Sequence, residues 1–174
     1  MLGRTHALVG AITVWWLVVP FISVDYAAPL LLCGAVGALL PDLDSPRSLL
    51  TAWRIAGISP LRPLASLINQ TFGHRGALHS LLGWVIASLG FILLLLLPLW
   101  SALGSLALSL GYLSHLAADA CTKTGIPIFY PGRIRYRLLP KPLRISTGSF
   151  AEDVVFACFS LLLVLGLIIS LVTT

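Results

Sequence analysis

The chain has 174 residues, of which 58% are hydrophobic and only 10% are charged, and its mean hydropathy is +1.00. A soluble domain is nearer half apolar and a quarter charged, so this composition excludes a soluble enzyme, a disordered tail and a coiled coil. The formal net charge of +5 is interpreted as a topology signal and an attraction to anionic lipid headgroups. No nucleic-acid partner is expected, because no basic run is interleaved with aromatic residues.

Five apolar segments are long enough to be considered as membrane-spanning helices. They cover residues 7–24, 27–41, 78–100, 102–121 and 154–172. The first two are predicted to form a helical hairpin, as are the third and fourth. The second segment has only 15 residues, so it is expected to tilt little or to end below the headgroups. We therefore predict an all-α, polytopic membrane bundle forming one membrane-embedded domain over residues 1–174.

The segments between these spans also carry structural signals. Ser45 followed by Pro46 is typical of a helix start. Between residues 60 and 72 apolar side chains recur at helical spacing, which predicts a short helix in the membrane interface. Residues 125–144 contain too many prolines and glycines for a long helix, so we expect an extended or hairpin lid.

The basic residues are distributed on one side of this five-span arrangement. All 11 Lys and Arg precede the first span or lie in the loops 42–77 and 122–153. The positive-inside rule then places the N-terminus and both loops in the cytoplasm and the C-terminus outside.

The acidic and histidine residues follow the same division, because only Asp25 falls on the outer side. The other nine lie at the cytoplasmic ends of the five predicted spans: His6, Asp42, Asp44, His74, His79, His115, Asp119, Glu152 and Asp153. A bundle brings these ends together, which predicts a polar cluster at the cytoplasmic membrane surface.

Imidazole and carboxylate groups in such a cluster favour a metal site. His115 and Asp119 are four residues apart and share one helical face, while Asp42 and Asp44 can bind one ion or bridge two. Mixed shells of this kind suit zinc, manganese or iron. These signals also have simpler interpretations. Glu152, for example, fits a capping box begun by Ser149. His115 and Asp119 are likewise compatible with a buried hydrogen-bonded pair.

Five short motifs resemble those of the YdjM-type family, which comprises bacterial and archaeal inner-membrane proteins regarded as metal-dependent hydrolases. They are Thr5-His6-Ala7, Leu40-Pro41-Asp42-Leu43-Asp44, His74-Arg75-Gly76-x-x-His79-Ser80, Gly111-Tyr112-Leu113-Ser114-His115-x-x-x-Asp119 and Thr147-Gly148-Ser149-x-x-Glu152. The family is in turn distantly similar to zinc-dependent phospholipase C.

The resemblance implies a metal-dependent phosphoester hydrolase with a metal-activated water as nucleophile. Because the cluster is predicted at the cytoplasmic membrane surface, we expect a lipid or lipid-linked substrate and an active site facing the cytoplasm. Two or more divalent ions are expected, zinc first and manganese second. Arg75, together with His74, is expected to orient the phosphate or protonate the leaving oxygen. The expected metal ligands are His6, Asp42, Asp44, His79, His115, Asp119 and Glu152, and the expected headgroup-binding residues are Arg133, Arg135 and Arg137.

Two other functions also place His and Asp inside a helical bundle. A transporter or metal-ion channel would carry ionisable side chains at several depths. A non-catalytic scaffold with a structural metal would need only four ligands, fewer than this chain offers.

Overall fold

The computed structural model describes residues 1–46, 48–54, 57–73, 75–98 and 100–173. Over these residues the chain is helical with no β-strand, and two isolated β-bridges occur in the loop before the last helix. The predicted all-α class is therefore confirmed. The helices are α1 (Gly3–Leu17), α2 (Ala27–Leu39), α3 (Leu49–Ala52), α4 (Arg62–Phe72), α5 (Leu81–Leu93), α6 (Ala102–Ala120) and α7 (Phe150–Thr173).

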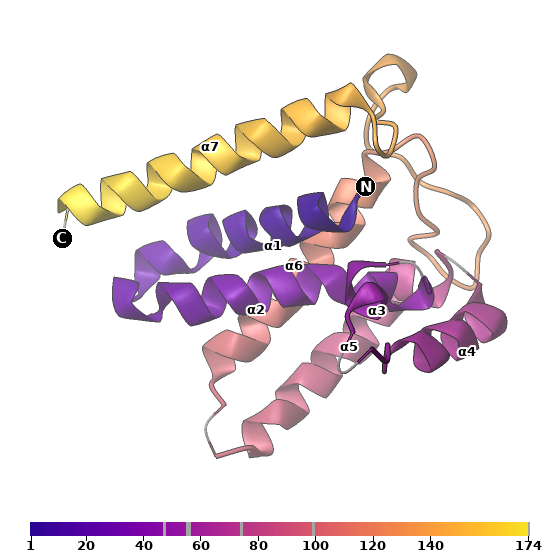
Figure 1. Cartoon of the computed structure of the whole chain (residues 1–174), viewed down its shortest axis with the longest axis horizontal. Helices are drawn as coiled ribbons and strands as arrows, with labels where there is room; N and C mark the ends of the chain where they lie inside the picture. Colours follow the sequence, from indigo (N-terminus) through magenta and orange to yellow (C-terminus); the bar gives the residue numbers. More distant parts are fainter. Residues whose placement is uncertain (47, 55–56, 74, 99, 174) are drawn as a thin grey trace.

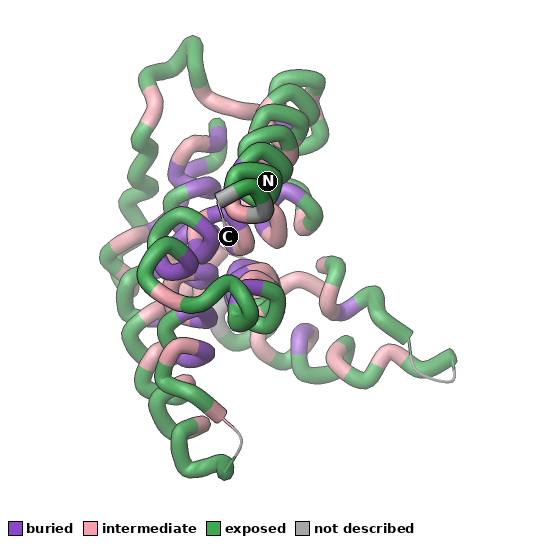
Figure 2. The backbone as a smooth tube through the Cα atoms, turned by 90° about the vertical axis from the view of Figure 1, so that its left-hand side faces the viewer, coloured by how far each residue is buried: buried purple, intermediate pink, exposed green. Residues whose placement is uncertain are grey.

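Helices α1, α2 and α6 form the centre of the bundle. α6 passes behind α1 and α2 in Figure 1 and packs against both, while α5 packs on α6 and α7 lies along α1. Buried residues concentrate in this middle part, and the outer helices are largely exposed (Figure 2). An exposed surface rich in Leu, Ile and Val is expected where lipid is the solvent, so this distribution fits a membrane bundle.

Glycines allow the three central helices to approach one another closely. A Cβ atom built on Gly34 would lie 2.7 Å from the carbonyl oxygen of Gly10, and one on Gly111 only 2.1 Å from that of Gly34. On Gly37 it would lie 2.1 Å from the carbonyl oxygen of Leu108. Small residues at such crossings are a common way for membrane helices to associate, and here they fix α6 against α2.

Replacing Gly37 by Val is therefore expected to separate α2 from α6 and to cost about 3 kcal/mol of stability, as overpacking does. Thermal unfolding of the detergent-solubilised protein, followed by circular dichroism, should show a clearly lower transition temperature. Gly90→Ala is the matched control, because Gly90 lies in α5 with no described atom within 4 Å of its added Cβ. That change should leave the transition unchanged or raise it. Equal transitions for both variants would contradict the close α2–α6 crossing.

Each of the five predicted spans contains a helix, but they differ in length and hydropathy, and the third, predicted over 78–100, has its long helical stretch over Leu81–Leu96 among the described residues. Three stretches are long and apolar enough to cross a membrane, namely Gly3–Phe21, Val24–Asp44 and Phe150–Ser170, and a shorter apolar stretch covers Leu81–Leu96. Helix α6 has 19 residues but is not one of these stretches. Its sequence includes buried polar side chains, as expected of a central helix. The count of five spans stays a prediction.

Two details of the sequence prediction were wrong. The second span is not short, because 3₁₀ turns extend α2 at both ends to a 21-residue helical stretch ending at Asp44. The following helix does not begin at Ser45-Pro46 either. Ser48 caps it instead, since its side-chain oxygen accepts a hydrogen bond from Thr51 N, and Ser45 has extended backbone angles that end the preceding turn.

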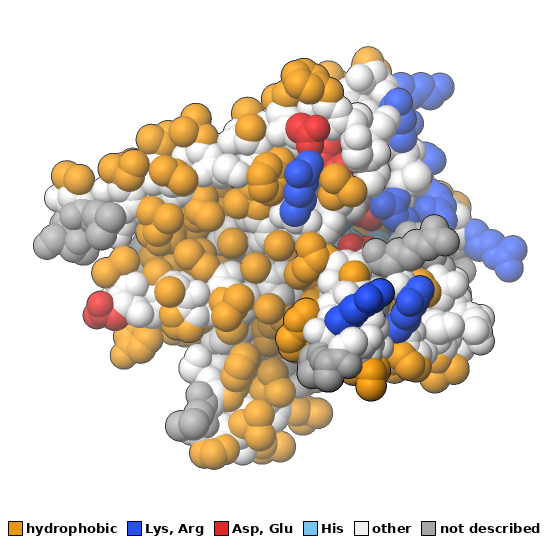
Figure 3. Space-filling model, in the orientation of Figure 1, with side chains coloured by type: hydrophobic (Ala, Val, Ile, Leu, Met, Phe, Trp, Pro, Cys, Tyr) orange, Lys and Arg blue, Asp and Glu red, His pale blue; other side chains and the backbone are white. Residues whose placement is uncertain are grey.

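Two other loop predictions are confirmed as local structure. The apolar repeat between residues 60 and 72 forms the amphipathic helix α4; its place in the membrane interface stays a prediction. Residues 125–144 form an irregular hairpin, in which Ile126 and Tyr136 exchange two backbone hydrogen bonds. Figure 3 shows Lys and Arg side chains gathered at the end of the bundle that carries these loops, while hydrophobic atoms cover the opposite end.

Candidate metal centre

Six of the predicted ligands converge at the basic end of the bundle. His6 comes from the start of α1, and Asp42 and Asp44 come from the 3₁₀ turn that ends α2. His79 lies in the 3₁₀ turn before α5. Three overlapping groups have ligand atoms within 4.8 Å of one another: His6, Asp42 and His115; His79, His115 and Asp119; and Asp42, Asp44 and His79. The predicted meeting of helix ends is thus confirmed for these six residues.

A backbone carbonyl fixes the tautomer of His115. Its Nδ1 lies 2.7 Å from the carbonyl oxygen of Ala38, and because a carbonyl can only accept, Nδ1 must carry the proton. In the neutral ring Nε2 then bears a lone pair, and this atom lies 3.2 Å from Nε2 of His79. A second hydrogen bond that orients a metal-binding imidazole is the usual arrangement in metal sites.

Asp44 orients His79 in the same way. Its Oδ2 lies 3.1 Å from His79 Nδ1 and also accepts the backbone N–H of Arg75 at 2.8 Å. Nδ1 of His79 thus faces Asp44, and Nε2 of the same ring lies 3.2 Å from Nε2 of His115. Without an ion, a proton on Nε2 can therefore bridge the two imidazoles, and a metal would compete with that proton.

Two carboxylate oxygens each lie within 4.0 Å of both histidine Nε2 atoms. Nε2 of His79 lies 3.7 Å from Asp42 Oδ1 and 3.8 Å from Asp119 Oδ2. Nε2 of His115 lies 3.9 and 4.0 Å from the same two oxygens. An ion with ligands at about 2.0–2.1 Å separates neighbouring ligand atoms by about 3.3 Å. Each carboxylate oxygen is a few tenths of an ångström farther from the two nitrogens than neighbouring ligands of one zinc ion are from each other, so the donor set fits zinc.

His6 offers a further nitrogen beside this group. Its ring stacks on that of His115 with centroids 3.7 Å apart, and it is fully buried. Neither ring nitrogen has an aligned hydrogen-bond partner among the described residues, although Nε2 lies 3.3 Å from Asp119 Oδ1. A buried imidazole without such a partner is costly, and a cation beside Nε2 would remove that cost.

The carboxylate of Asp119 contacts two positively charged groups. Its Oδ1 accepts a hydrogen bond from the α-amino group of Met1 at 2.5 Å, and its Oδ2 lies 2.9 Å from a terminal nitrogen of Arg75. The side chain is 1% exposed. Two positive groups thus balance its charge, and a metal ion bound at Oδ2 would compete with the Arg75 guanidinium for that oxygen.

Arg75 connects the cluster to a pocket on the surface. Its backbone is in the left-handed region, with φ +57°, which is unusual for a residue other than glycine and clusters at functional sites. Its second terminal nitrogen donates to Thr124 Oγ1. The adjoining pocket has a volume of about 540 Å³ and is lined by Arg75, Gly76, Pro127, Tyr130, Pro131, Gly132, Arg133 and Arg135.

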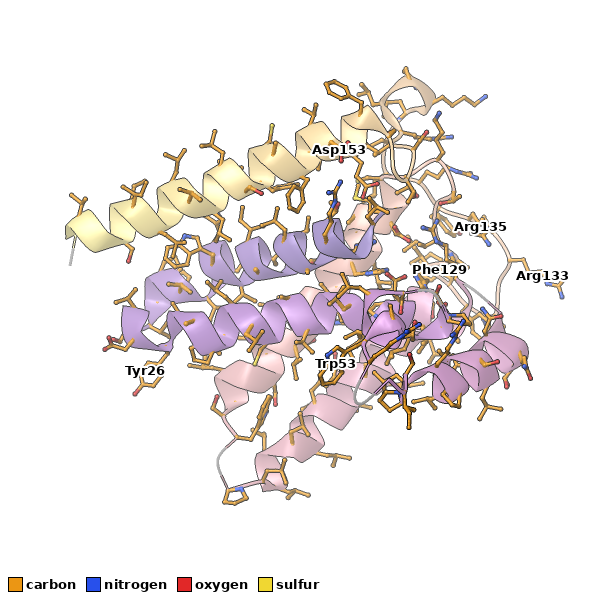
Figure 4. All side chains as sticks on the ribbon, viewed as in Figure 1. Tyr26, Trp53, Phe129, Arg133, Arg135 and Asp153 are labelled. Atoms are coloured by element: carbon orange, nitrogen blue, oxygen red, sulfur yellow. The ribbon has the colours of Figure 1, made fainter. Side chains whose placement is uncertain are left out.

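The three predicted headgroup-binding arginines are placed differently. Arg133 and Arg135 line this pocket; in Figure 4, Arg133 extends away from the bundle and Arg135 lies nearer the helix ends. Arg137 does not line it. Its guanidinium donates to the carbonyl oxygens of Lys123 and Arg135 and thereby ties the two arms of the hairpin together.

Glu152 lies outside the three ligand groups. It is fully buried, and its two oxygens accept the backbone N–H groups of Leu2 and Gly148 at 2.6 and 2.7 Å. These contacts join the start of α7 to the start of α1. Glu152 thus accepts backbone N–H groups at a helix start, as a capping residue does.

His74 lies outside the described residues. The contacts of Ala38 with His115 and of Thr124 with Arg75 had no sequence signal, because a backbone carbonyl and a lone Thr carry no motif.

Comparison with known proteins agrees with these motifs. The family model described as "YdjM inner membrane protein" matches residues 1–173. The YvsG protein of Bacillus subtilis is 36% identical over 163 residues, which are 92% of this chain and 91% of that protein. The inner membrane protein YdjM of Escherichia coli is 40% identical over 126 residues, which are 71% of this chain and 54% of that protein. No solved structure matches.

The chain therefore belongs to the YdjM family of membrane proteins. It spans about half the length of the Escherichia coli relative and nearly the whole of the Bacillus subtilis one.

Proposed function

We propose that this member of the YdjM family is a membrane-embedded, metal-dependent hydrolase of a phosphoester in a lipid or lipid-linked substrate. The observation that carries the proposal is that Asp42 and Asp119 each place a carboxylate oxygen within 4.0 Å of Nε2 of His79 and of His115, beside an arginine-lined pocket. A bound zinc or manganese ion would activate a water molecule and polarise a phosphoryl oxygen.

The protein's own residues would hold the ion and the substrate. Asp44 and the carbonyl of Ala38 keep the lone pairs of His79 and His115 directed into the cluster. Arg75 lies between Asp119 and the pocket, so its guanidinium can donate a hydrogen bond to a phosphate oxygen placed in the pocket. Arg133 and Arg135 would bind the rest of the anionic group. His6 is available to a second ion, and Glu152 and His74 remain candidates for completing the site.

The exposure of the cluster residues favours approach from the basic end. The side chains of His6, His79, His115, Asp44 and Asp119 are at most 1% exposed, while Asp42 is 17% and Arg75 13% exposed. A substrate would therefore reach the ligands past Asp42 and Arg75. A transporter would instead need a path onward through the bundle.

The direct test is hydrolysis of phospholipids and isoprenoid phosphates in mixed micelles by the purified protein. We expect release of the headgroup or phosphate, loss of activity with a chelator, and recovery with zinc or manganese. Asp44→Asn should lower the rate at least tenfold, because outer contacts of metal sites matter by about 10–100-fold. Chelator-sensitive cleavage of a soluble peptide, with every phosphoester untouched, would reject the phosphoester assignment and leave the metal site standing.

The orientation that we propose is N-terminus and basic end in the cytoplasm, with five spans and the C-terminus outside. It rests on the 11 Lys and Arg of one side, which the positive-inside rule assigns to the cytoplasm. Reporter fusions at Asp25 and after Thr174 should report the outer side of the inner membrane, and a fusion at Arg54 the cytoplasm. A cytoplasmic reporter after Thr174 would reject the five-span arrangement.

A further inference from the structure

A second basic pocket lies between the segment that follows α3 and the start of α4. It is shallow, with a volume of about 500 Å³, and Arg54, Ser59, Arg62 and Ser66 are among the residues that line it. Among the described residues, its lining contains two arginines and no acidic side chain. None of these residues also lines the pocket beside the metal cluster, so the mechanism proposed above does not use it.

The chemistry of this pocket suits a phosphate group. Two guanidinium groups on one concave surface can donate several hydrogen bonds to phosphate oxygens. Arg62 is also the first residue of α4, an 11-residue helix, so the positive end of the helix dipole adds to the attraction for an anion.

Apolar side chains around the pocket indicate that the phosphate belongs to a lipid. Trp53 is 63%, Ile58 70%, Leu64 46% and Leu67 62% exposed. Figure 3 shows Lys or Arg atoms over α3 and the start of α4 bordered by hydrophobic atoms, and Figure 4 shows Trp53 on this side of the molecule. Tryptophan and arginine together are typical of the membrane–water boundary, where the ring meets acyl chains and the cation meets headgroups.

We propose that the pocket formed by Arg54 and Arg62 binds the phosphate headgroup of an anionic phospholipid and fixes the α3–α4 segment to the bilayer. The proposal is independent of the hydrolase assignment, because neither the metal ligands nor Arg75 take part in it. The bound lipid is a structural partner in this site, not a substrate.

Native mass spectrometry of the full-length protein in detergent, titrated with phosphatidylglycerol or phosphatidylcholine, tests the proposal. The wild type should retain phosphatidylglycerol preferentially. The double variant Arg54→Gln/Arg62→Gln should bind it about tenfold more weakly, since each lost cation near a headgroup weakens the attraction severalfold. Lys123→Gln/Lys141→Gln removes the same charge from exposed positions outside the pocket and should bind as the wild type does.

Three further measurements distinguish lipid binding from misfolding, from binding of a free anion and from metal-dependent binding. Arg54→Lys/Arg62→Lys keeps the charge and should retain most of the binding, which also guards against a loss of fold in the glutamine variant. Displacement of the lipid by millimolar inorganic phosphate would identify a free anion as the ligand and overturn the lipid assignment. Chelator treatment should leave lipid binding unchanged even if the hydrolase assignment fails. Wild-type affinity in the glutamine variant, or an equal loss in the lysine-to-glutamine control, would also overturn the proposal.

Discussion

His115→Ala and Asp119→Ala are each expected to abolish stoichiometric metal binding. Both side chains come from the last turns of α6, both are buried, and both direct ligand atoms to the same point as His79. Removing either takes one ligand from the proposed site, and the loss of His115 also removes the hydrogen bond to the carbonyl of Ala38. Metal analysis of the purified, detergent-solubilised protein by mass spectrometry measures the loss directly.

Two variants make this result specific. Asp25→Asn, at the opposite end of the bundle, should keep the full metal content, since Asp25 is exposed and accepts a hydrogen bond from Ser23. Asp44→Asn should bind metal about 10–100-fold more weakly without losing it, as expected for a carboxylate that orients a histidine ligand. If all four variants held as much metal as the wild type, the cluster would be a buried hydrogen-bonded network with a structural role.

The position of the site could be predicted from the sequence because polar residues stand at the ends of long apolar segments. In a helical bundle, helix ends on one side of the membrane must meet whatever the packing order, so His6, Asp42 and His115 could be brought together without a structure. The arrangement of the central helices needed more. Gly34 and Gly111 determine how closely α2 and α6 approach, but sequence spacing does not say which glycines face each other.

The division of roles within the cluster could not be predicted for the same reason. Asp42 and Asp44 are equivalent in sequence, yet a 3₁₀ turn directs Asp42 to both histidine Nε2 atoms and Asp44 to the far side of the His79 ring. Arg135 and Arg137 are two residues apart on one arm of the hairpin, a spacing that would place both on the same face of an extended strand. Only the folded loop shows that Arg135 lines the pocket, whereas Arg137, whose guanidinium donates to the carbonyls of Lys123 and Arg135, does not.

The loop residue with the largest expected effect on the proposed reaction is Arg75. Its guanidinium is held between Asp119 and Thr124 at the wall of the arginine-lined pocket, where it could stabilise charge that develops on a phosphoryl oxygen in the proposed reaction. Arg75→Gln should therefore lower kcat about 10²–10³-fold, the range seen when one donor to a developing oxyanion is removed. Arg75→Lys should recover only part of this, because an ammonium cannot contact Asp119, Thr124 and phosphate with the same planar fork.

The comparison with the hairpin arginines separates this role from a general loss of positive charge. Arg135→Gln should mainly raise KM, since Arg135 lines the pocket away from the ligands, and Arg137→Gln should change neither constant more than a few-fold. Metal content must be measured in the same Arg75 preparations. A full complement of metal with a lost kcat places Arg75 at the reacting phosphate, whereas loss of the metal would show that Arg75 acts through Asp119 and would contradict its contact with substrate.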